Sequence, residues 1–481
     1  MWSRLTAVAV VSGFVVALPL RAQAPSSTGG ARLELTSSSE DAKAAFRLAL
    51  FHALNQSPVH ATTNLDKALA LDPEFGLALA YRSTPAFSPG VDAAERGRRL
   101  SDAIGRMTKA SAAEMLLAVS LREIAAGRTE VAKQLLRAVS DMVPGDPDVA
   151  YLLASQQIAG RPPAEAQQGL RTFLARFPDH AAAQNQMAYS SWAAGDRAAA
   201  FAAGERYLQV APMLANPHDT YADLLLLDRR PDEAVPHVTK AMEADPTYAG
   251  GHQKLGAIDL MKGNSASALS HFGAGRDAAR TPAAKLENQH WIAVAHVLDR
   301  NLKAAMAALG EAATLAESEK LPAGPRALPH QRMAVVEALL GNRAAVQAHL
   351  DKSAEIGGAS TGGQTAHATI AFASIGDIAA ARNAAAEFAK VVAPGNPAVR
   401  TFNALIALLA KDVAAASAEL ANANPNDLLA KELRAEVLKS QGKTAEAKQL
   451  RAEILSSSVK QDGNNAVNFF NVVARLRADK L

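Results

Sequence analysis

The sequence predicts an all-α fold, a right-handed superhelical solenoid of about eleven or twelve helix-turn-helix repeats with a C-terminal capping helix. Three observations predict it. Pro178, Pro212 and Pro246 stand 34 residues apart, small residues recur in pairs twelve residues apart, and the chain is 49% hydrophobic but only 5% aromatic. A fixed period in this range is typical of stacked two-helix units. Alanine, which supplies much of the apolar share, favours closely packed helices.

The small pairs indicate where the two helices of one hairpin cross, because close approach needs a small side chain on both helices. Gly or Asn/Asp turn signals, such as AAGRTE and AAGDRA, separate most pairs, and prolines close several units. Each pair therefore predicts one hairpin. The pairs are Ala49 and Ala61, Ser120 and Ala132, Ala188 and Ala200, Ala222 and Ala234, Gly256 and Ala268, Ala293 and Ala305, Thr369 and Ala381, Ala404 and Ala416, and Ala435 and Ala447.

The repeated pattern resembles the tetratricopeptide repeat (TPR). Residues 215–248 carry it best, with Tyr221-Ala222, Leu225, Ala234, Ala241 and Pro246 at the matching places, and residues 42–73 and 249–282 also match well. The resemblance implies a repeat scaffold and says little about function. Weaker units are expected to begin near Ala113, Asp146, Ala181, Leu286, Ala327, Gly362, Pro397 and Leu428, with a blurred one at 76–112.

The N-terminus reads as a signal peptide at 1–24, with a positive start, an apolar run from Leu5 to Leu18, and Ala22-Gln23-Ala24 as the small-x-small pattern. Periplasmic or secreted localisation is the expectation. Pro25 would directly follow the cut and is unfavourable there, so cleavage after Ala22 or an uncleaved anchor stays open. The chain has no cysteine, which excludes disulfides, thiolate chemistry and lipid attachment to cysteine.

The remaining organisation follows from where the period holds and where it drifts. We expect a flexible linker at 25–36, a TPR-like array at 37–316, a long loop or hinge at 317–331, a continued array at 332–465, and a capping helix at 466–481. Residues 83–92 and 357–363 also depart from the period. Loops of this kind are usually tolerated surface features.

Charge and motifs narrow the function classes. The formal charge of +3 becomes +1 without Arg4 and Arg21 of the leader, and no basic run stands out, so we expect no nucleic acid partner. HExxH, GxSxG, GxxxxGK[ST] and Rossmann glycine patterns are absent. The sequence therefore predicts a protein that is not an enzyme and that takes no small-molecule cofactor.

Two sets of polar residues suggest a metal site or an acid-base pair, but the sequence favours neither. His218 and His252 are one period apart, as are His237 and His271, but equivalent positions of adjacent repeats are too far apart to share one zinc ion. We therefore expect no metal site. Asp219 and Asp223 lie on one helix face, and we interpret them as an acidic strip facing a partner, since nothing indicates a pocket that would raise one pKa.

The functional prediction is geometric. In the TPR resemblance, the second, fifth, ninth, twelfth and thirteenth positions of a unit face the concave groove, where carboxamides can pair with a peptide backbone and aromatic rings give rigid contact area. The strip is acidic and amide-bearing, which favours a basic or neutral peptide over a free carboxylate. The predicted groove residues are Asn185, Tyr189, Trp192, Asn216, Asp219, Asp223, Gln253 and His290.

Three hypotheses follow. The first is an exported scaffold that binds a peptide or protein in its groove, without a membrane span once the leader is removed. The second is a structural subunit of an envelope complex, joined through the convex face or the terminal caps. The third is an enzyme with an unrecognised site. Alternatively, Trp192 packs only against the neighbouring unit and the polar residues are simply solvated.

Overall fold

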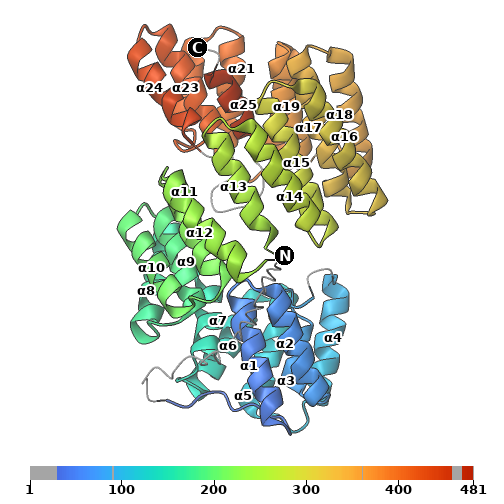
Figure 1. Cartoon of the computed structure of the whole chain (residues 1–481), viewed down its shortest axis with the longest axis vertical. Coiled ribbons are helices and arrows are strands. Elements are labelled where there is room, and N and C mark those ends of the chain that lie inside the picture. Colours follow the sequence, from blue (N-terminus) through green and yellow to red (C-terminus); the bar gives the residue numbers. More distant parts are fainter. Residues whose placement is uncertain (1–29, 89–90, 247, 360, 458–468, 480–481) are drawn as a thin grey trace, which may run out of the picture. The chain divides into compact units, whose positions relative to one another are not determined.

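The computed structural model describes residues 30–88, 91–246, 248–359, 361–457 and 469–479, and within these ranges every regular element is an α-helix. The predicted signal peptide at 1–24 lies outside the described residues. These described residues divide into two compact units, one of residues 30–161 together with 168–180, and one of residues 162–167 and those described from 181 to 479. The predicted all-α repeat solenoid is confirmed (Figure 1).

The first unit is built from four helical hairpins. The pairs α1/α2, α3/α4 and α5/α6 pack together, and α7 contacts α8 through the rings of Tyr151 and Phe173, 5.7 Å apart. The start of α8 is assigned to the second unit. The helices are α1 (Glu40–Leu54), α2 (Pro58–Leu71), α3 (Gly76–Arg82), α4 (Ala93–Arg106), α5 (Ala112–Ala125), α6 (Thr129–Met142), α7 (Pro147–Ile158) and α8 (Pro163–Arg176).

The segment before α1 corrects the predicted linker at 25–36. From residue 30 onward this segment has no regular secondary structure, but it is held on the first unit. Leu33 and Leu35 are buried, and carboxylates of that unit accept hydrogen bonds from its backbone. Glu114 accepts from the Thr36 amide at 2.7 Å, and Asp146 accepts from the Leu33 amide at 3.1 Å. The backbone that was expected to be flexible is therefore fixed by these hydrogen bonds.

The second unit continues with eight consecutive hairpins and one final helix. The hairpins are consecutive pairs from α9/α10 to α23/α24. The helices are α9 (Ala181–Ala193), α10 (Arg197–Val210), α11 (Ala215–Leu227), α12 (Pro231–Ala244), α13 (Ala249–Met261), α14 (Ser265–Ala278), α15 (Pro282–Leu298), α16 (Leu302–Ser318), α17 (Ala323–Leu340), α18 (Arg343–Gly357), α19 (Gly362–Ser374), α20 (Ile378–Val391), α21 (Pro397–Leu409), α22 (Val413–Ala421), α23 (Leu428–Ser440), α24 (Thr444–Leu455) and α25 (Phe469–Ala478).

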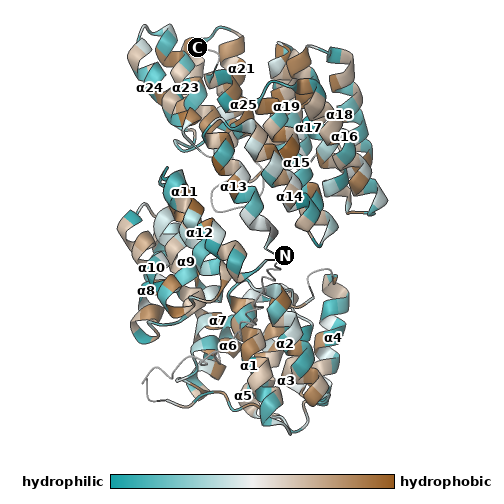
Figure 2. Ribbon diagram, viewed as in Figure 1, coloured by the Kyte–Doolittle hydropathy of each residue, from teal (hydrophilic) through white to brown (hydrophobic). Residues whose placement is uncertain are grey.

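The ladder of small pairs occupies the crossing points, as predicted. Its alanines are at most 1% exposed, from Ala49 to Ala447. The turns between the two helices also form as the sequence indicates. Gly195 and Gly376 take the left-handed conformation, and Asp196 and Asp377 each accept a hydrogen bond from an amide in the first turn of α10 and α20. Figure 2 shows apolar residues on every helix, mixed with polar ones along its length.

The predicted long loop or hinge at 317–331 is wrong. α16 continues to Ser318 and α17 begins at Ala323, so only residues 319–322 connect them. Pro322 and Pro325 suggested a break, but they stand before and within the first turn of α17, where backbone amides need no helical acceptor. Pro329 alone lies inside the helix.

The last helix, α25, packs on far more than the last hairpin. It contacts α23, α24 and α15, its Phe470 ring lies 5.1 Å from His367 of α19, and its Arg475 donates to the Leu260 carbonyl of α13 at 3.5 Å. In Figure 1 this dark red helix lies among the first helices of the surrounding hairpins. Val472 and Ala474 are fully buried. We call α13, α15, α17, α19, α21 and α23 the inner helices.

Candidate functional site

The first helices of three successive hairpins, α9, α11 and α13, bring charged and phenolic groups together. The Tyr189 hydroxyl donates to Asp223 Oδ2 at 3.0 Å, and Lys254 Nζ lies 2.8 Å from Asp223 Oδ1. Lys254 also donates to Asp219, which accepts a second hydrogen bond from the Tyr248 hydroxyl. We call Tyr189, Asp219, Asp223, Tyr248 and Lys254 the buried network.

The electrostatics of the buried network differ from those of an open acidic strip. Asp219 and Asp223 are 8% and 7% exposed, and Lys254 is fully buried. Burial alone would lower the pKa of Lys254, but the two carboxylates outweigh it and raise that pKa, so the ammonium stays charged. Burial, and then the carboxylates, raise the pKa of Tyr189 and Tyr248 well above the usual value, which keeps both as neutral donors.

The other predicted groove residues lie in two places: Asn185, Asn216 and Gln253 are in α9, α11 and α13, and His290 is in α15. Asn185 accepts from the Thr220 hydroxyl at 2.9 Å, and Asn216 donates to the Tyr207 hydroxyl at 3.0 Å, so both carboxamides have partners within the repeats. Gln253, the residue before Lys254, is buried. His290 is apart from this group, fully buried in α15, where burial and then the charge of Arg332 hold its pKa well below the usual range.

Trp192 stays half-exposed at the end of α9. Its ring packs edge-on against Phe201 at 6.4 Å, and the Arg197 guanidinium lies over it at 5.1 Å. The packing on Phe201 is within its own hairpin, α9/α10. The part of the indole that these contacts leave open lines a cleft.

This cleft, of about 860 Å³, lies within the second unit. Trp192 and Asp223 line it, so it includes two of the predicted groove residues. Residues from the N-terminal half of α21, from the connection before α23 and from the start of α25 form the facing wall, and most of them are polar. The side chains of that wall include Asn396, Thr401, Phe402, Asn424, Asn426, Asp427 and Asn471.

Charges in the cleft are matched. Arg197 pairs with Asp228 at 3.1 Å, and Glu453 lies 3.8 Å from Arg229 and 3.6 Å from Lys431. These pairs are at least partly exposed, so each contributes little to stability. Their consequence for a ligand is that no single sign of charge dominates.

Sequence reasoning missed Lys254, Tyr248 and the facing wall. Lys254 follows Asp219 by 35 residues, close to one repeat period, and this spacing was the available signal. The facing wall had a compositional signal in the asparagine-rich stretch ANANPND. Neither spacing nor composition identifies which repeats meet across the cleft.

The described residues contain no group of three or more His, Cys, Asp or Glu side chains arranged to hold a metal ion. Within the same ranges, no helix combines the length and the hydropathy that crossing a membrane requires. The chemistry that the cleft offers is hydrogen bonding from amides and hydroxyls beside an indole ring.

The hairpins, the buried small-residue ladder and the turn chemistry define an all-α helical-repeat solenoid whose hairpins resemble those of the TPR. No family model and no curated protein sequence matches the chain. Among solved structures, it is similar in fold to TTC0263, a TPR protein of Thermus thermophilus, with 19% identity over 38% of this chain and 99% of that one, at a TM-score of 0.32.

Two further solved structures give the same picture. The type IV pilus biogenesis factor PilW has 20% identity over 44% of this chain and 92% of its own, at a TM-score of 0.35. The APC/C hetero-tetramer Cut9-Hcn1 has 13% identity over 92% of this chain and 97% of that one, at 0.33. The resemblance to the TPR depends on the hairpins of this chain itself.

Proposed function

We propose that this chain is a non-catalytic protein-interaction scaffold of the cell envelope, which holds a polypeptide segment in the cleft of its second unit. The observation that carries the proposal is the lining of the cleft. A half-exposed indole, Trp192, stands on one side and a group of asparagines on the other. Carboxamides donate and accept hydrogen bonds, so they can pair with both the N–H and the C=O groups of an extended backbone.

The location of α25 supports the cleft over the remaining inner surface. α25 covers the inner helices, with the Phe469 ring 5.7 Å from the Arg332 guanidinium and Phe470 6.0 Å from Phe402. A partner segment would have to replace these contacts to reach the same surface. The cleft needs no such displacement.

The buried network changes the kind of partner we propose. Lys254 already neutralises much of the charge of Asp219 and Asp223, so a basic peptide gains less there than the acidic strip suggested. The matched ion pairs around the cleft likewise favour no strongly charged ligand. We propose a segment of mixed or neutral charge that is recognised through its backbone and one apolar side chain set against Trp192.

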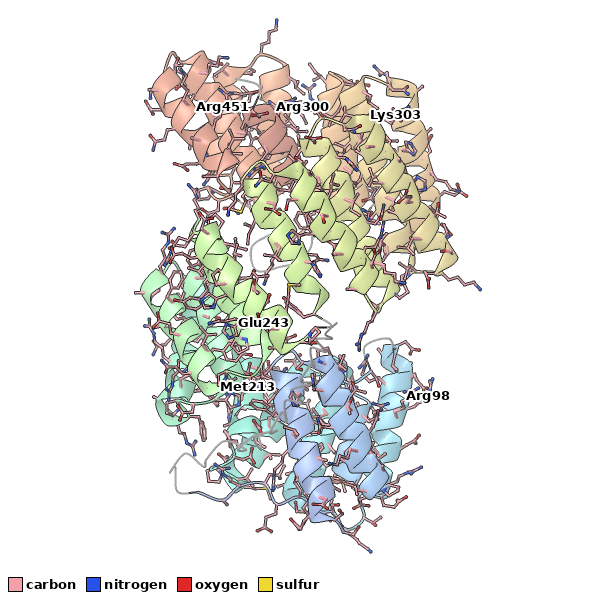
Figure 3. The ribbon with its side chains drawn as sticks, in the orientation of Figure 1. Arg98, Met213, Glu243, Arg300, Lys303 and Arg451 are labelled. Atoms are coloured by element: carbon pink, nitrogen blue, oxygen red, sulfur yellow. The ribbon has the colours of Figure 1, made fainter. Side chains whose placement is uncertain are left out.

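Affinity capture of the exported chain from its own cells, followed by binding measurements with the purified partner, tests the proposal. Trp192→Ala should weaken the affinity at least about tenfold, since tryptophans at the centre of interfaces carry much of the binding energy. The matched control is Lys303→Ala, an exposed residue of α16 labelled in Figure 3. Equal affinities for both variants would overturn the cleft as the binding site.

We propose export on the strength of the N-terminal sequence alone. The positive start, the apolar run and the Ala22-Gln23-Ala24 pattern are those of a cleaved leader. Cell fractionation followed by mass spectrometry of the intact chain should find it outside the cytoplasm, beginning at Gln23 or Pro25. An uncleaved chain in the cytoplasm would contradict this localisation.

A further inference from the structure

Three hairpins of the second unit carry a histidine on each helix, always 19 residues apart. They are α11/α12 with His218 and His237, α13/α14 with His252 and His271, and α17/α18 with His330 and His349. The 34-residue intervals, from His218 to His252 and from His237 to His271, therefore relate one histidine pair to the next. The two histidines that contact each other are 19 residues apart. The partners of each pair face each other across one hairpin.

The spacing of 19 follows from hairpin geometry. The small residues at a crossing point, such as Ala222 and Ala234, are twelve apart. One helical turn further from the connecting loop lies four residues earlier on the first helix and three later on the second. Side chains at those two positions meet, which is why the same contact recurs whenever both are histidine.

In two of the pairs, the Nδ1 atoms of the two rings lie within hydrogen-bond distance of each other. The Nδ1 atoms of His218 and His237 are 3.2 Å apart, and those of His330 and His349 are 3.3 Å apart. The third pair is more open, with ring centroids 6.0 Å apart, and His271 instead has its Nε2 3.6 Å from Asp259 Oδ2. All six rings are half-buried, so water and small ions can reach them.

The two close pairs hold their nitrogens at nearly the separation that a shared metal ion requires. Two nitrogens bound at 2.0–2.1 Å to one tetrahedral ion lie roughly 3.3–3.4 Å apart. A hydrogen bond explains the same distance, with one nitrogen donating and the other accepting. The two alternatives differ in what happens when an ion is added, because both Nδ1 atoms can bind it only if the donating ring carries its proton on Nε2 instead.

Neutral imidazole is the form that binds metals, and the surroundings favour it. Burial, then the neighbouring His237 and Lys240, lower the pKa of His218; burial, then His349 and Lys352, lower that of His330. Both nitrogens are therefore available at neutral pH without acid competition. The nearby ammonium groups also repel a cation, which limits the affinity.

We propose that the His218–His237 and His330–His349 pairs each bind one divalent late transition-metal ion, Cu(II), Ni(II) or Zn(II), through their Nδ1 atoms, with water completing the coordination. Imidazole ligands suit these ions. Each ion would link the two helices of one hairpin and stiffen that repeat. This inference does not depend on the proposed partner cleft.

Titration of the untagged full chain with CuCl2, NiCl2 or ZnCl2 tests the proposal by calorimetry and, for Cu(II), by electron paramagnetic resonance. We expect two ions per chain in the tight phase, with nitrogen coordination in the Cu(II) spectrum. His237→Ala and His349→Ala should each remove one ion, and the double variant both. Circular dichroism checks that each variant stays helical.

The open pair supplies the matched control. His271→Ala changes the same repeat position and the same residue type, and it should leave the two tight ions bound. A wild-type chain without nitrogen-coordinated Cu(II) would overturn the proposal, and this result needs no variant. Two tight ions retained in the double variant would overturn it as well.

Discussion

Lys254 is a fully buried cation whose charge is matched by two carboxylates of a neighbouring helix, Asp219 and Asp223. Pairs of this kind seldom add stability over an apolar core, but removal of one partner leaves an uncompensated charge in a low-dielectric region. The buried network therefore joins α11 to α13 in a way that tolerates no single charge change. Charge reversal at the aspartates would test folding before it tested binding.

Lys254→Met should destabilise the second unit by about 3–5 kcal/mol, because two buried carboxylates lose their counter-charge. Urea unfolding followed by circular dichroism measures the change. The control is Lys262→Met, whose partner Asp232 is largely exposed, and it should cost less than about 1 kcal/mol. Similar losses for both variants would contradict the assigned role of the network.

The sequence placed Asp219 and Asp223 on one helix face, but it predicted an open acidic strip where the structure has a buried network with Lys254. Their position within the repeat follows from the 34-residue period. The spacing of 35 residues placed Lys254 one repeat further on, but the contact itself depends on how one repeat is rotated against the next, which the spacing does not give. The same limit applies to Trp192, whose neighbour Phe201 comes from the period but whose facing wall comes from repeats about 200 residues later.

At the scale of the helix pair, the size of the side chain at a crossing point limits how closely the two helices pack. Gly256 packs against Phe272, and a Cβ atom added there would lie 2.4 Å from the ring of Phe272. That ring is buried and stacked on Trp291, with centroids 5.3 Å apart, so it has little room to move. Glycine is needed at position 256 because the Phe272 ring leaves no room for a Cβ atom, and not because the backbone takes a conformation that only glycine favours.

Gly256→Ala should therefore destabilise the chain by about 1–3 kcal/mol, although alanine is the better helix former. Thermal unfolding compares it with Gly273→Ala in the next helix, α14, where an added Cβ meets nothing within 4 Å. That control should be neutral or stabilise by up to about 1 kcal/mol. A stabilising Gly256→Ala would refute the crossing-point interpretation.

α25 is the element that the sequence described least well. Its apolar spacing predicted a helix that covers the last hairpin, and the structure shows contacts to helices from α13 to α24. Helical periodicity reports which residues are apolar, whereas the partners of a final helix depend on where the array brings its inner surface. The repeat starts were predicted better, because each is fixed by a local turn and its small pair.

Val472→Asp should destabilise the second unit by more than about 3 kcal/mol, since the side chain is fully buried and a carboxylate there would lose its hydration. Urea unfolding is the measurement. Asp479→Asn, at the end of the same chain segment, breaks only the exposed pair with Arg300 and should cost less than about 1 kcal/mol. An unchanged unfolding midpoint for Val472→Asp would show that α25 does not pack on the inner helices.

At the scale of the whole molecule, histidines make the chain sensitive to acid. Burial is the first cause that lowers the pKa of His52 and of His367, each to about 4. Six further histidines have lowered pKa values for the same first reason. They are His218, His237, His252, His290, His330 and His349.

Proton linkage gives the direction in which stability changes with pH. Each folded pKa lies below the unfolded value of about 6.5, so the unfolded chain binds more protons as the pH falls. Stability should be complete above about pH 6.5 and decrease progressively toward about pH 4, by up to about 1.4 kcal/mol per pH unit for each fully neutral buried histidine. Urea midpoints at about pH 7.5, 6.0 and 5.0 span this window and measure the change. A midpoint independent of pH across that window would contradict the neutral histidines.

The central claim is that a polypeptide partner occupies the cleft of the second unit. A photo-crosslinking amino acid placed at Asn426, in the facing wall, or at Lys303, on exposed α16, tests it most directly in the native cell. The account predicts one dominant crosslinked protein for position 426, lost when Trp192 is changed to alanine, and none for position 303. Equal crosslinking at both positions, or capture at 426 that survives Trp192→Ala, would contradict the account.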